Sequence, residues 1–339
     1  MPFLGSVHSM VSYGRGKRGA SWTNGGVVTT LAGNNTGGFA NGTGTNASFY
    51  FPNGVVYHPT NGNIFVADVE TQRIRLVTPD GVVTTFAGSG SYSFADGTGG
   101  GASFRNPRGV AVDSNNNVVV ADMANQRIRL ITPAGVVTTL AGSGSYGFAD
   151  GTGGGASFAN PYGVAVLPDG NIAVADGGNN RIRIVTPAGV VTTLAGSGTA
   201  QFADGTGTNA SFSTPYGIAY DPTTGNIVVA DVNTSRVRLI TYPGGVVTTL
   251  AIITYVKGVA VTPTGVIVVA WGNDGGGNKI LLVTPAGVVT TLAGSGSQGS
   301  ADGTGTNASF NDPRGVAVNP LSGVIAVAGY NEQRIRLIT

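Results

Sequence analysis

The chain has 339 residues, including 57 Gly and 16 Pro; only 10% are charged, and the formal net charge is +2. It has no Cys, which excludes disulfides, thiolate-bound zinc, iron–sulfur clusters and a thiol nucleophile. The small net charge gives no sign of a nucleic-acid partner. Hydrophobic residues make up 41% of the chain, enough to form a sizeable core. This hydrophobicity and the low charge argue against disorder, which is typical of chains with low hydrophobicity or high net charge.

Residues 1–25 lie before any repeat, and we predict an N-terminal arm rich in Gly, Arg and Ser, followed by one domain over residues 26–339. The arm has no apolar run typical of a secretory signal, so we expect cytoplasmic synthesis, and no apolar run in the chain is long enough to span a bilayer. The arm also carries candidate anchor residues: Phe3, Leu4, Tyr13, Arg15, Lys17, Arg18 and Trp22. In this respect it resembles the anchoring ends of virion surface proteins from phages and large viruses.

Three short strings recur six times each, in strict rotation. They are Gly-Val-Val-Thr-Thr, Arg-Ile-Arg-Leu or a close variant, and Pro-x-Gly-Val or a close variant. The first string starts at Gly26, Gly81, Gly135, Gly189, Gly245 and Gly287, so successive copies are 55, 54, 54, 56 and 42 residues apart. Internal repeats of this length are typical of solenoids and propellers.

Each repeat predicts four short strands. In the second unit they are 109–113, 117–122, 127–132 and 135–141. Runs of β-branched residues separated by Gly, Pro, Asn and Asp favour strands and tight turns. No segment has sustained helical periodicity.

The two ends of the chain indicate a closed ring. The repeats begin with a lone fourth strand at 26–32 and end with the first three strands of a unit at 315–339. Pairing these segments completes a sixth blade and leaves no terminal edge, whereas a solenoid would need capping repeats. We therefore predict an all-β, six-bladed β-propeller of four-stranded antiparallel blades, closed by the N-terminal strand pairing with the three C-terminal strands.

The units Pro-x-Gly-Val-Ala-Val, Val-Ala-Asp and Asn-x-Arg-Ile-Arg resemble the NHL repeat, which builds six-bladed propellers. The resemblance covers about residues 26–339. It leaves function open, because NHL-type propellers include RNA and protein binders, a zinc-dependent amidating lyase and cell-surface modules.

The residue x of Pro-x-Gly directly precedes each innermost strand, so these six residues should ring one mouth of the central channel. They are Asn53, Arg108, Tyr162, Tyr216, Lys257 and Arg314. This positively charged, hydrogen-bonding set could hold a carboxylate, a phosphate or a sugar. The alternative is a water-filled funnel without a ligand.

Five of the six connections between blades carry Asp or Asn followed by Gly-Thr-Gly, and then Ala-Ser-Phe. The connection from blade four to blade five, at 251–257, lacks this insert, which predicts a notch on one rim. One carboxylate in each insert is too few for calcium, so we predict Asx-type turns that the Phe pins to the blade, with no metal or cofactor. Aromatic insert tips either form an adhesive rim for sugars or proteins or fold back onto the blades. The rim candidates are Tyr92, Phe94, Tyr146, Phe148 and Phe202.

In the first four blades the Asp that ends the second strand, such as Asp122, should pair with the first Arg of the third strand, such as Arg127. Blade five breaks this pattern with Trp271 and Lys279, and blade six keeps its Arg but has Gly329 in place of the Asp. The second Arg, such as Arg129, shares a strand face with the first. A radial basic array for RNA is the alternative to a structural role for these arginines.

The residues needed for catalysis are scarce. Only His58 lies in the repeats, and Glu occurs only at Glu70 and Glu332. The zinc site of lyase relatives and the calcium site of propeller lactonases therefore cannot be matched, and we predict that the protein is not an enzyme.

We therefore predict a structural or interaction propeller with protein partners, a surface component of a larger multi-subunit assembly such as a virion, anchored by its arm. The alternatives are a module that binds RNA, carbohydrate or peptide at the channel mouth, and a lyase- or lactonase-like enzyme.

Overall fold

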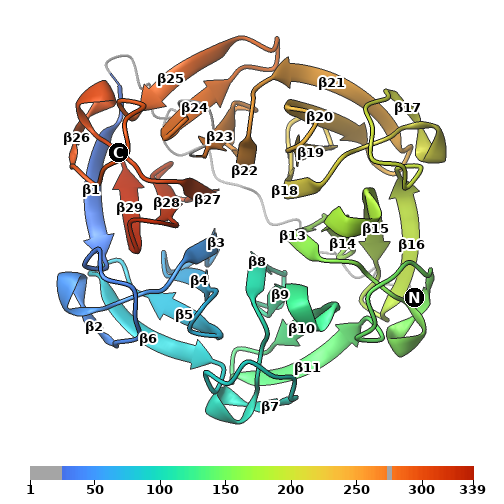
Figure 1. Cartoon of the computed structure of the whole chain (residues 1–339), viewed down its shortest axis with the longest axis horizontal. Coiled ribbons are helices and arrows are strands. Elements are labelled where there is room, and N and C mark those ends of the chain that lie inside the picture. Colours follow the sequence, from blue (N-terminus) through green and yellow to red (C-terminus); the bar gives the residue numbers. More distant parts are fainter. Residues whose placement is uncertain (1–24, 273–276) are drawn as a thin grey trace, which may run out of the picture.

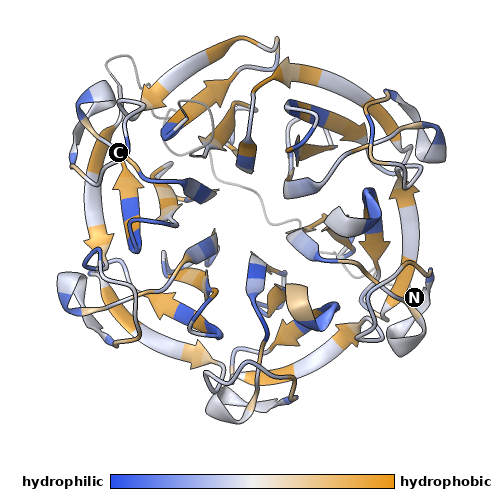
Figure 2. Ribbon diagram, viewed as in Figure 1, coloured by the Kyte–Doolittle hydropathy of each residue, from blue (hydrophilic) through white to orange (hydrophobic). Residues whose placement is uncertain are grey.

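The computed structural model describes residues 25–272 and 277–339, which form six antiparallel sheets around a central channel (Figure 1). We number these sheets as blades I to VI. Within a blade, consecutive strands run from the channel to the rim, because short turns join neighbouring antiparallel strands. The strands are rich in Val, Ile and Thr, which suit a pleated, half-buried surface. Figure 2 shows hydrophobic residues along the strands of every blade.

Blades I to IV follow one plan, in which a two-residue strand lies outside the fourth strand. Blade I contains β2 (Gly42–Thr43), β3 (Pro52–Tyr57), β4 (Ile64–Asp68), β5 (Arg73–Val77) and β6 (Val82–Ala87). Blade II contains β7 (Gly97–Thr98), β8 (Pro107–Val112), β9 (Val118–Asp122), β10 (Arg127–Ile131) and β11 (Val136–Ala141). Blade III contains β12 (Gly151–Thr152), β13 (Pro161–Val166), β14 (Ile172–Asp176), β15 (Arg181–Val185) and β16 (Val190–Ala195). Blade IV contains β17 (Gly205–Thr206), β18 (Pro215–Tyr220), β19 (Asn226–Asp231), β20 (Arg236–Thr241) and β21 (Val246–Ile252).

The last two blades differ from that plan: blade V has four strands, and blade VI is built from both ends of the described chain. Blade V contains β22 (Val256–Val261), β23 (Ile267–Trp271), β24 (Lys279–Val283) and β25 (Val289–Ala293). Blade VI contains β26 (Gly303–Thr304), β27 (Pro313–Val318), β28 (Ile325–Gly329), β29 (Arg334–Ile338) and β1 (Val27–Ala32). The helices of the described part are three-residue 3₁₀ turns, and none of them could cross a membrane. They are η1 (Gly44–Asn46), η2 (Gly99–Gly101), η3 (Met123–Asn125), η4 (Gly153–Gly155), η5 (Gly177–Asn179), η6 (Gly207–Asn209) and η7 (Gly305–Asn307).

Ring closure is confirmed. Strand β1 pairs antiparallel with β29, with Val28 opposite Ile338, and the main chains of Val27 and Thr339 exchange two hydrogen bonds of 3.0 Å. The first described strand therefore completes the last blade, as the orphan ends of the repeat predicted.

The inserts account for the strands that the prediction of four-stranded blades lacked. Each insert contributes a two-residue strand to the outer edge of the blade that follows it, as β7 does on β11. The Phe at the end of each insert is fully buried, which confirms that it pins the loop to the blade; these residues are Phe49, Phe104, Phe158, Phe212 and Phe310.

A buried ion pair repeats in blades I to IV, but not with the predicted Arg. In blade II, Asp122 lies 2.6 Å from Nη1 of Arg129, and both side chains are fully buried. The insert residue Asp96 binds Nη2 of the same guanidinium at 2.6 Å. Arg127 lies opposite Asp122 in strand register but donates instead to main-chain carbonyls, at 3.1 Å to that of Asn125. The predicted pairing is wrong because the deeper Arg129 is cut off from water and needs the carboxylate, whereas Arg127 lies nearer the surface.

Burial removes the second arginines from the alternative basic array for RNA. All five are fully buried in the described structure: Arg75, Arg129, Arg183, Arg238 and Arg336. Their repetition therefore serves the blades.

Candidate functional site

The glycines of Pro-x-Gly position the channel mouth, because each one packs against the main chain of the next blade. A Cβ on Gly109 would lie 2.5 Å from the carbonyl oxygen of Tyr162, and one on Gly315 would lie 2.1 Å from that of Asn53. Real Cβ atoms are not found so close to main-chain atoms, so these positions require Gly. The close contacts run around the whole ring and bring the six predicted mouth residues to one level of the channel.

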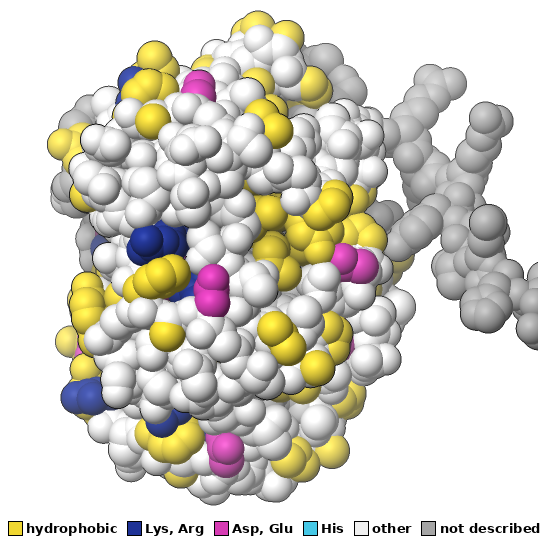
Figure 3. Space-filling view, turned by 90° about the vertical axis from the view of Figure 1, so that its right-hand side faces the viewer, with side chains coloured by type: hydrophobic (Ala, Val, Ile, Leu, Met, Phe, Trp, Pro, Cys, Tyr) yellow, Lys and Arg dark blue, Asp and Glu magenta, His cyan; other side chains and the backbone are white. Residues whose placement is uncertain are grey.

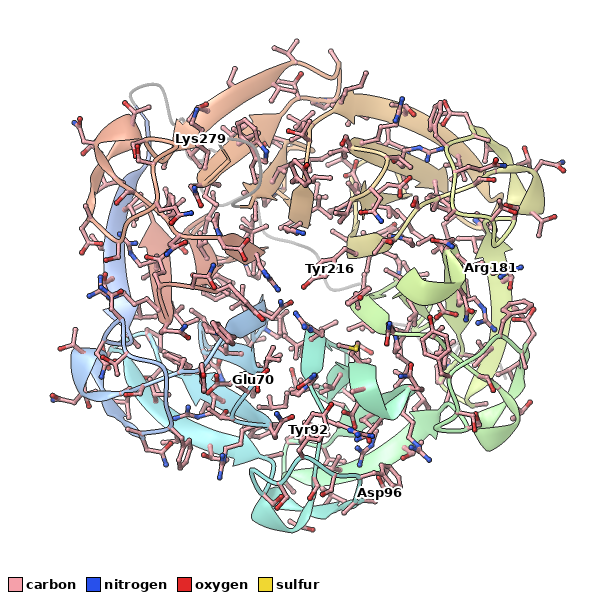
Figure 4. All side chains as sticks on the ribbon, in the orientation of Figure 1. Glu70, Tyr92, Asp96, Arg181, Tyr216 and Lys279 are labelled. Atoms are coloured by element: carbon pink, nitrogen blue, oxygen red, sulfur yellow. The ribbon has the colours of Figure 1, made fainter. Side chains whose placement is uncertain are left out.

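Tyr216 lies at the centre of this mouth and points into the channel (Figure 4). Its hydroxyl oxygen accepts a 2.8 Å hydrogen bond from Nδ2 of Asn53, which belongs to the opposite blade, and a 3.3 Å bond from Nη1 of Arg108. Tyr162 stacks on it, with the ring centroids 4.7 Å apart. The mouth is therefore narrowed by side chains that contact one another across the ring.

Two more cations complete the mouth. Arg314 forms a 2.8 Å ion pair with Asp312 and stacks on Tyr330, with its guanidinium carbon 3.3 Å from the ring centroid. The ammonium of Lys257 lies 5.8 Å from the centroid of the Tyr216 ring. Together with Arg108, these residues place three positive charges near one carboxylate, so the described part of the mouth has an excess of positive charge.

The positive charge changes the acidity of the central phenol. Burial acts to raise the pKa of Tyr216, but Arg108, Arg314 and the hydrogen bond from Asn53 outweigh it and lower that pKa. For Arg108, burial acts to lower the pKa, but the neighbouring Tyr216 outweighs burial and raises that pKa. By contrast, burial raises the pKa of Tyr162. The mouth therefore favours a negative charge close to the Tyr216 oxygen.

Polar groups are concentrated at this end of the channel. At the mouth lies a cavity of about 70 Å³, lined by the glycines of Pro-x-Gly, by Val or Ile, and by the mouth residues Asn53, Tyr162, Tyr216 and Arg314. Further in, a wider space of about 410 Å³ is lined mainly by apolar residues of the inner strands.

The predicted rim aromatics fold back onto the blades while keeping one face exposed. Phe94, Phe148 and Phe202 stack on first-position arginines at 3.8–3.9 Å, and Tyr92 stacks on Arg105 at 4.4 Å. Tyr146 is the most exposed of the five predicted residues, at 65%. On the side of the molecule seen in Figure 3, charged side chains are few and scattered among uncharged groups.

Three contact residues were missed from sequence. Phe39 stacks on Arg73 at 3.9 Å in blade I, and its Phe-Ala-Asn-Gly string, which matches Phe-Ala-Asp-Gly of later inserts, could have revealed it. At the mouth, Asp312 and Tyr330 hold Arg314. Both vary between repeat copies, and their convergence depends on the fold of blade VI.

The remaining predictions concern metals and the arm. Residues 25–272 and 277–339 contain no group of three His, Cys, Asp or Glu side chains that could hold a metal ion. His58 lies away from the mouth, on a turn where its Nδ1 accepts a 3.3 Å bond from the amide of Thr60. The seven anchor candidates, Phe3, Leu4, Tyr13, Arg15, Lys17, Arg18 and Trp22, lie outside the described residues.

Comparison with known proteins agrees with this architecture. The family model of the NHL repeat matches residues 49–75, 104–129 and 158–185. The chain is an NHL-repeat β-propeller. It is 32% identical over 229 residues to protein SUPPRESSOR OF QUENCHING 1, chloroplastic, of Arabidopsis thaliana, covering 63% of this chain and 22% of the plant protein. It is 27% identical over 340 residues to NHL repeat-containing protein 2 of Bos taurus, covering 85% of this chain and 46% of the bovine protein. The chain thus spans less than half the length of these relatives.

Solved structures share the fold at low identity. A structural genomics protein of unknown function from Bacteroides thetaiotaomicron superposes with a TM-score of 0.70 at 20% identity, covering 93% of this NHL propeller and 76% of that chain. A putative gluconolactonase gives 0.62 at 14% identity, with 93% and 92% covered. A streptogramin B lyase gives 0.59 at 12% identity, with 94% and 99% covered. At these identities the similarity establishes the fold alone.

Proposed function

We propose that this propeller is a non-catalytic binding module that holds a carboxylate of a protein partner at its channel mouth. The observation that carries the proposal is the convergence of Arg108, Arg314 and Lys257 around the Tyr216 hydroxyl, where Asp312 is the one carboxylate of that cluster among residues 25–272 and 277–339. Protein interaction is also a common role of NHL propellers.

The chemistry of the mouth suits an anion held by direct hydrogen bonds. Guanidinium groups bind carboxylates through charge-assisted bonds, and partial burial strengthens such bonds. Arg108 donates only one hydrogen bond among the described contacts, to Tyr216 at 3.3 Å, so most of its donors remain available. A neutral sugar could stack on Tyr162 and Tyr216, but it would not use the positive charge.

The absence of catalysis is part of the proposal, and its support is the chemistry of the mouth residues. A general base needs a pKa near the working pH, whereas interaction with the Tyr216 oxygen raises the pKa of Arg108 and Arg314 further above neutrality. These two guanidinium groups can hold charge, but neither is suited to exchange a proton at pH 7.

Membership of a larger assembly or virion, with residues 1–25 as the anchor, stays a prediction. The candidate anchor residues lie outside the described part, so the support remains their sequence.

Titration calorimetry with a short acidic peptide, Gly-Gly-Glu-Glu-Gly-Gly, tests the proposal against its Gln-Gln counterpart. We expect the acidic peptide to bind more tightly, and Arg108→Gln to weaken it about tenfold or more, the effect of losing one charged hydrogen bond. Arg105→Gln removes the same charge outside the mouth and should change the affinity less than twofold. Equal binding of the two peptides, or equal loss in the two variants, would refute the proposal. A single-stranded oligonucleotide that binds while the peptide does not would favour the RNA alternative.

A further inference from the structure

The outer strand of blade V is uncovered, unlike its five counterparts. The second Val of each Gly-Val-Val-Thr-Thr string is 0–1% exposed in the other blades: Val28, Val83, Val137, Val191 and Val247. In blade V the corresponding Val289 is 40% exposed, and its neighbour Val288 is 57% exposed. The missing insert of blade V accounts for this difference.

The main chain shows what is missing. In blade II, strand β7 pairs with the start of β11, with Gly97 opposite Val137, and the amide of Gly99 donates to the carbonyl of Gly135 at 2.9 Å. Strand β25 pairs with β24, and no strand within 25–272 or 277–339 pairs with its outer edge. An open edge next to exposed Val side chains is a ready template for another extended segment.

The side chains of blade V define the chemistry of that segment. In blade II, Asp96 reaches from the insert to Arg129 at 2.6 Å and accepts a bond from the hydroxyl of Thr139 at 3.2 Å. In blade V, Leu281 stands where the other blades have this Arg, and it is buried. A carboxylate placed there would lose water without gaining a cation, so the edge suits a strand without Asp or Glu.

The first described residues of the chain lie next to this edge. The amide of Gly26 donates a 3.2 Å hydrogen bond to the carbonyl of Leu292, near the end of β25. Residues 1–24 precede this point and contain three basic residues but no Asp or Glu. At ~3.3 Å per extended residue, only five or six of them would match the length of β25.

The same segment carries a sequence that this chain already packs against its blades. Residues 19–24 read Gly-Ala-Ser-Trp-Thr-Asn, while 101–106 read Gly-Ala-Ser-Phe-Arg-Asn and 155–160 read Gly-Ala-Ser-Phe-Ala-Asn. In both inserts the Ala and the Phe are fully buried.

We propose that residues 1–24 bind in cis along the outer edge of β25 and supply the strand that blade V lacks. Three observations support the proposal: no described strand covers the edge, its chemistry disfavours acidic strands, and Gly26, which follows the acid-free segment in sequence, lies beside it. The proposal is independent of the function of the mouth. It competes with the prediction that this segment anchors the propeller elsewhere, because residues bound along β25 are not free to act as an anchor.

Thiol labelling tests the proposal directly, since the chain has no native Cys. We expect Val289→Cys to react with a maleimide at least tenfold more slowly in the full chain than in a chain lacking residues 1–24. Val136→Cys is the matched control: it lies on an outer strand that already has its fifth strand, so its rate should be the same in both chains. Equal rates for Val289→Cys in the two chains would overturn the proposal.

Two further measurements identify the occupant. Trp22→Asp in the full chain should speed labelling of Val289→Cys, which covers the case in which the shortened chain folds poorly; an unchanged rate would count against the segment. Protection should not depend on protein concentration, and light scattering should give a monomer. Protection that grows with concentration together with a dimer mass would assign the edge to a second copy and overturn binding in cis.

Discussion

Arginines occur both in the body of the blades and at the channel mouth, and their surroundings differ. Arg129 in blade II is fully buried and is bound by two carboxylates and the carbonyls of Ser103 and Ala95. Arg108 at the mouth has one hydrogen bond, to Tyr216. Arg129 has counterparts in four other blades, whereas the mouth position changes from blade to blade. The repeated Arg129 uses its hydrogen-bond donors within the blade, whereas Arg108, at a variable position, keeps donors available for a ligand.

The largest effect should come from breaking the buried pair. Asp122→Ala leaves the Arg129 guanidinium buried beside one half-exposed carboxylate, and removal of one partner of a buried pair costs about 3–5 kcal/mol of unfolding free energy. Denaturant unfolding followed by circular dichroism measures this loss.

Asp96→Asn is the control on the same guanidinium. Blade I already has Asn41 at this position, where its Oδ1 accepts a 2.9 Å bond from Arg75, so the loss should stay within about 1 kcal/mol. If both variants lost the same stability, the buried Asp would have no special role.

The second-largest loss of stability should come from substituting the Pro-x-Gly glycines that surround the mouth. Gly109→Ala places a Cβ 2.5 Å from the Tyr162 carbonyl, so blades II and III must separate slightly, at a cost of about 1–3 kcal/mol. Gly100→Ala is the control, since nothing lies within 4 Å of its Cβ. Thermal unfolding compares the two, and a Gly109→Ala variant as stable as the control would show that the ring is not tightly packed.

Substituting a rim aromatic should reduce stability less than Asp122→Ala or Gly109→Ala does. Phe148 stacks on Arg181 at 3.8 Å, an interaction worth about 0.5–1 kcal/mol at an exposed site. In the blade VI insert, Ser300 stands where the other inserts have this Phe. Phe148→Ser reproduces that natural difference, and we expect denaturant unfolding to show a loss below about 1 kcal/mol. A loss like that of Asp122→Ala would mean that the rim holds the blade together.

The fold was predictable because each β-branched string occurs six times and the ends of the chain are complementary. The partners of buried charges were harder to predict. In blade VI, Gly329 replaces the repeated Asp and suggested a lost pair, but Glu332 binds Arg336 at 2.5 Å. A Cβ on residue 329 would lie 2.1 Å from the Glu332 side chain, so Gly at position 329 makes room for the Glu332 carboxylate that replaces the missing Asp. The contact of Tyr216 with Asn53 joins opposite blades, and repeat spacing alone does not give that distance.

The smallest effect on stability, and the most specific to the mouth, should come from Tyr216. Its pKa is lowered below the usual value of about 10, so one of the 11 tyrosines should ionise early when absorbance at 295 nm is followed against pH. Between the folded and unfolded pKa values the unfolded chain binds more protons, so this group adds stability as pH rises from the folded pKa towards 10, and that contribution is lost as pH falls through the folded pKa.

Tyr216→Phe should remove the early ionisation and change stability at pH 7 by less than about 1 kcal/mol. Tyr162→Phe should keep the early ionisation, because burial raises the pKa of Tyr162. A bound acidic peptide would compete for the same cations and should raise the pKa of Tyr216. If the peptide binds but leaves this ionisation unchanged, its carboxylates lie away from Arg108 and Arg314, and the difference between blade and mouth arginines has another cause.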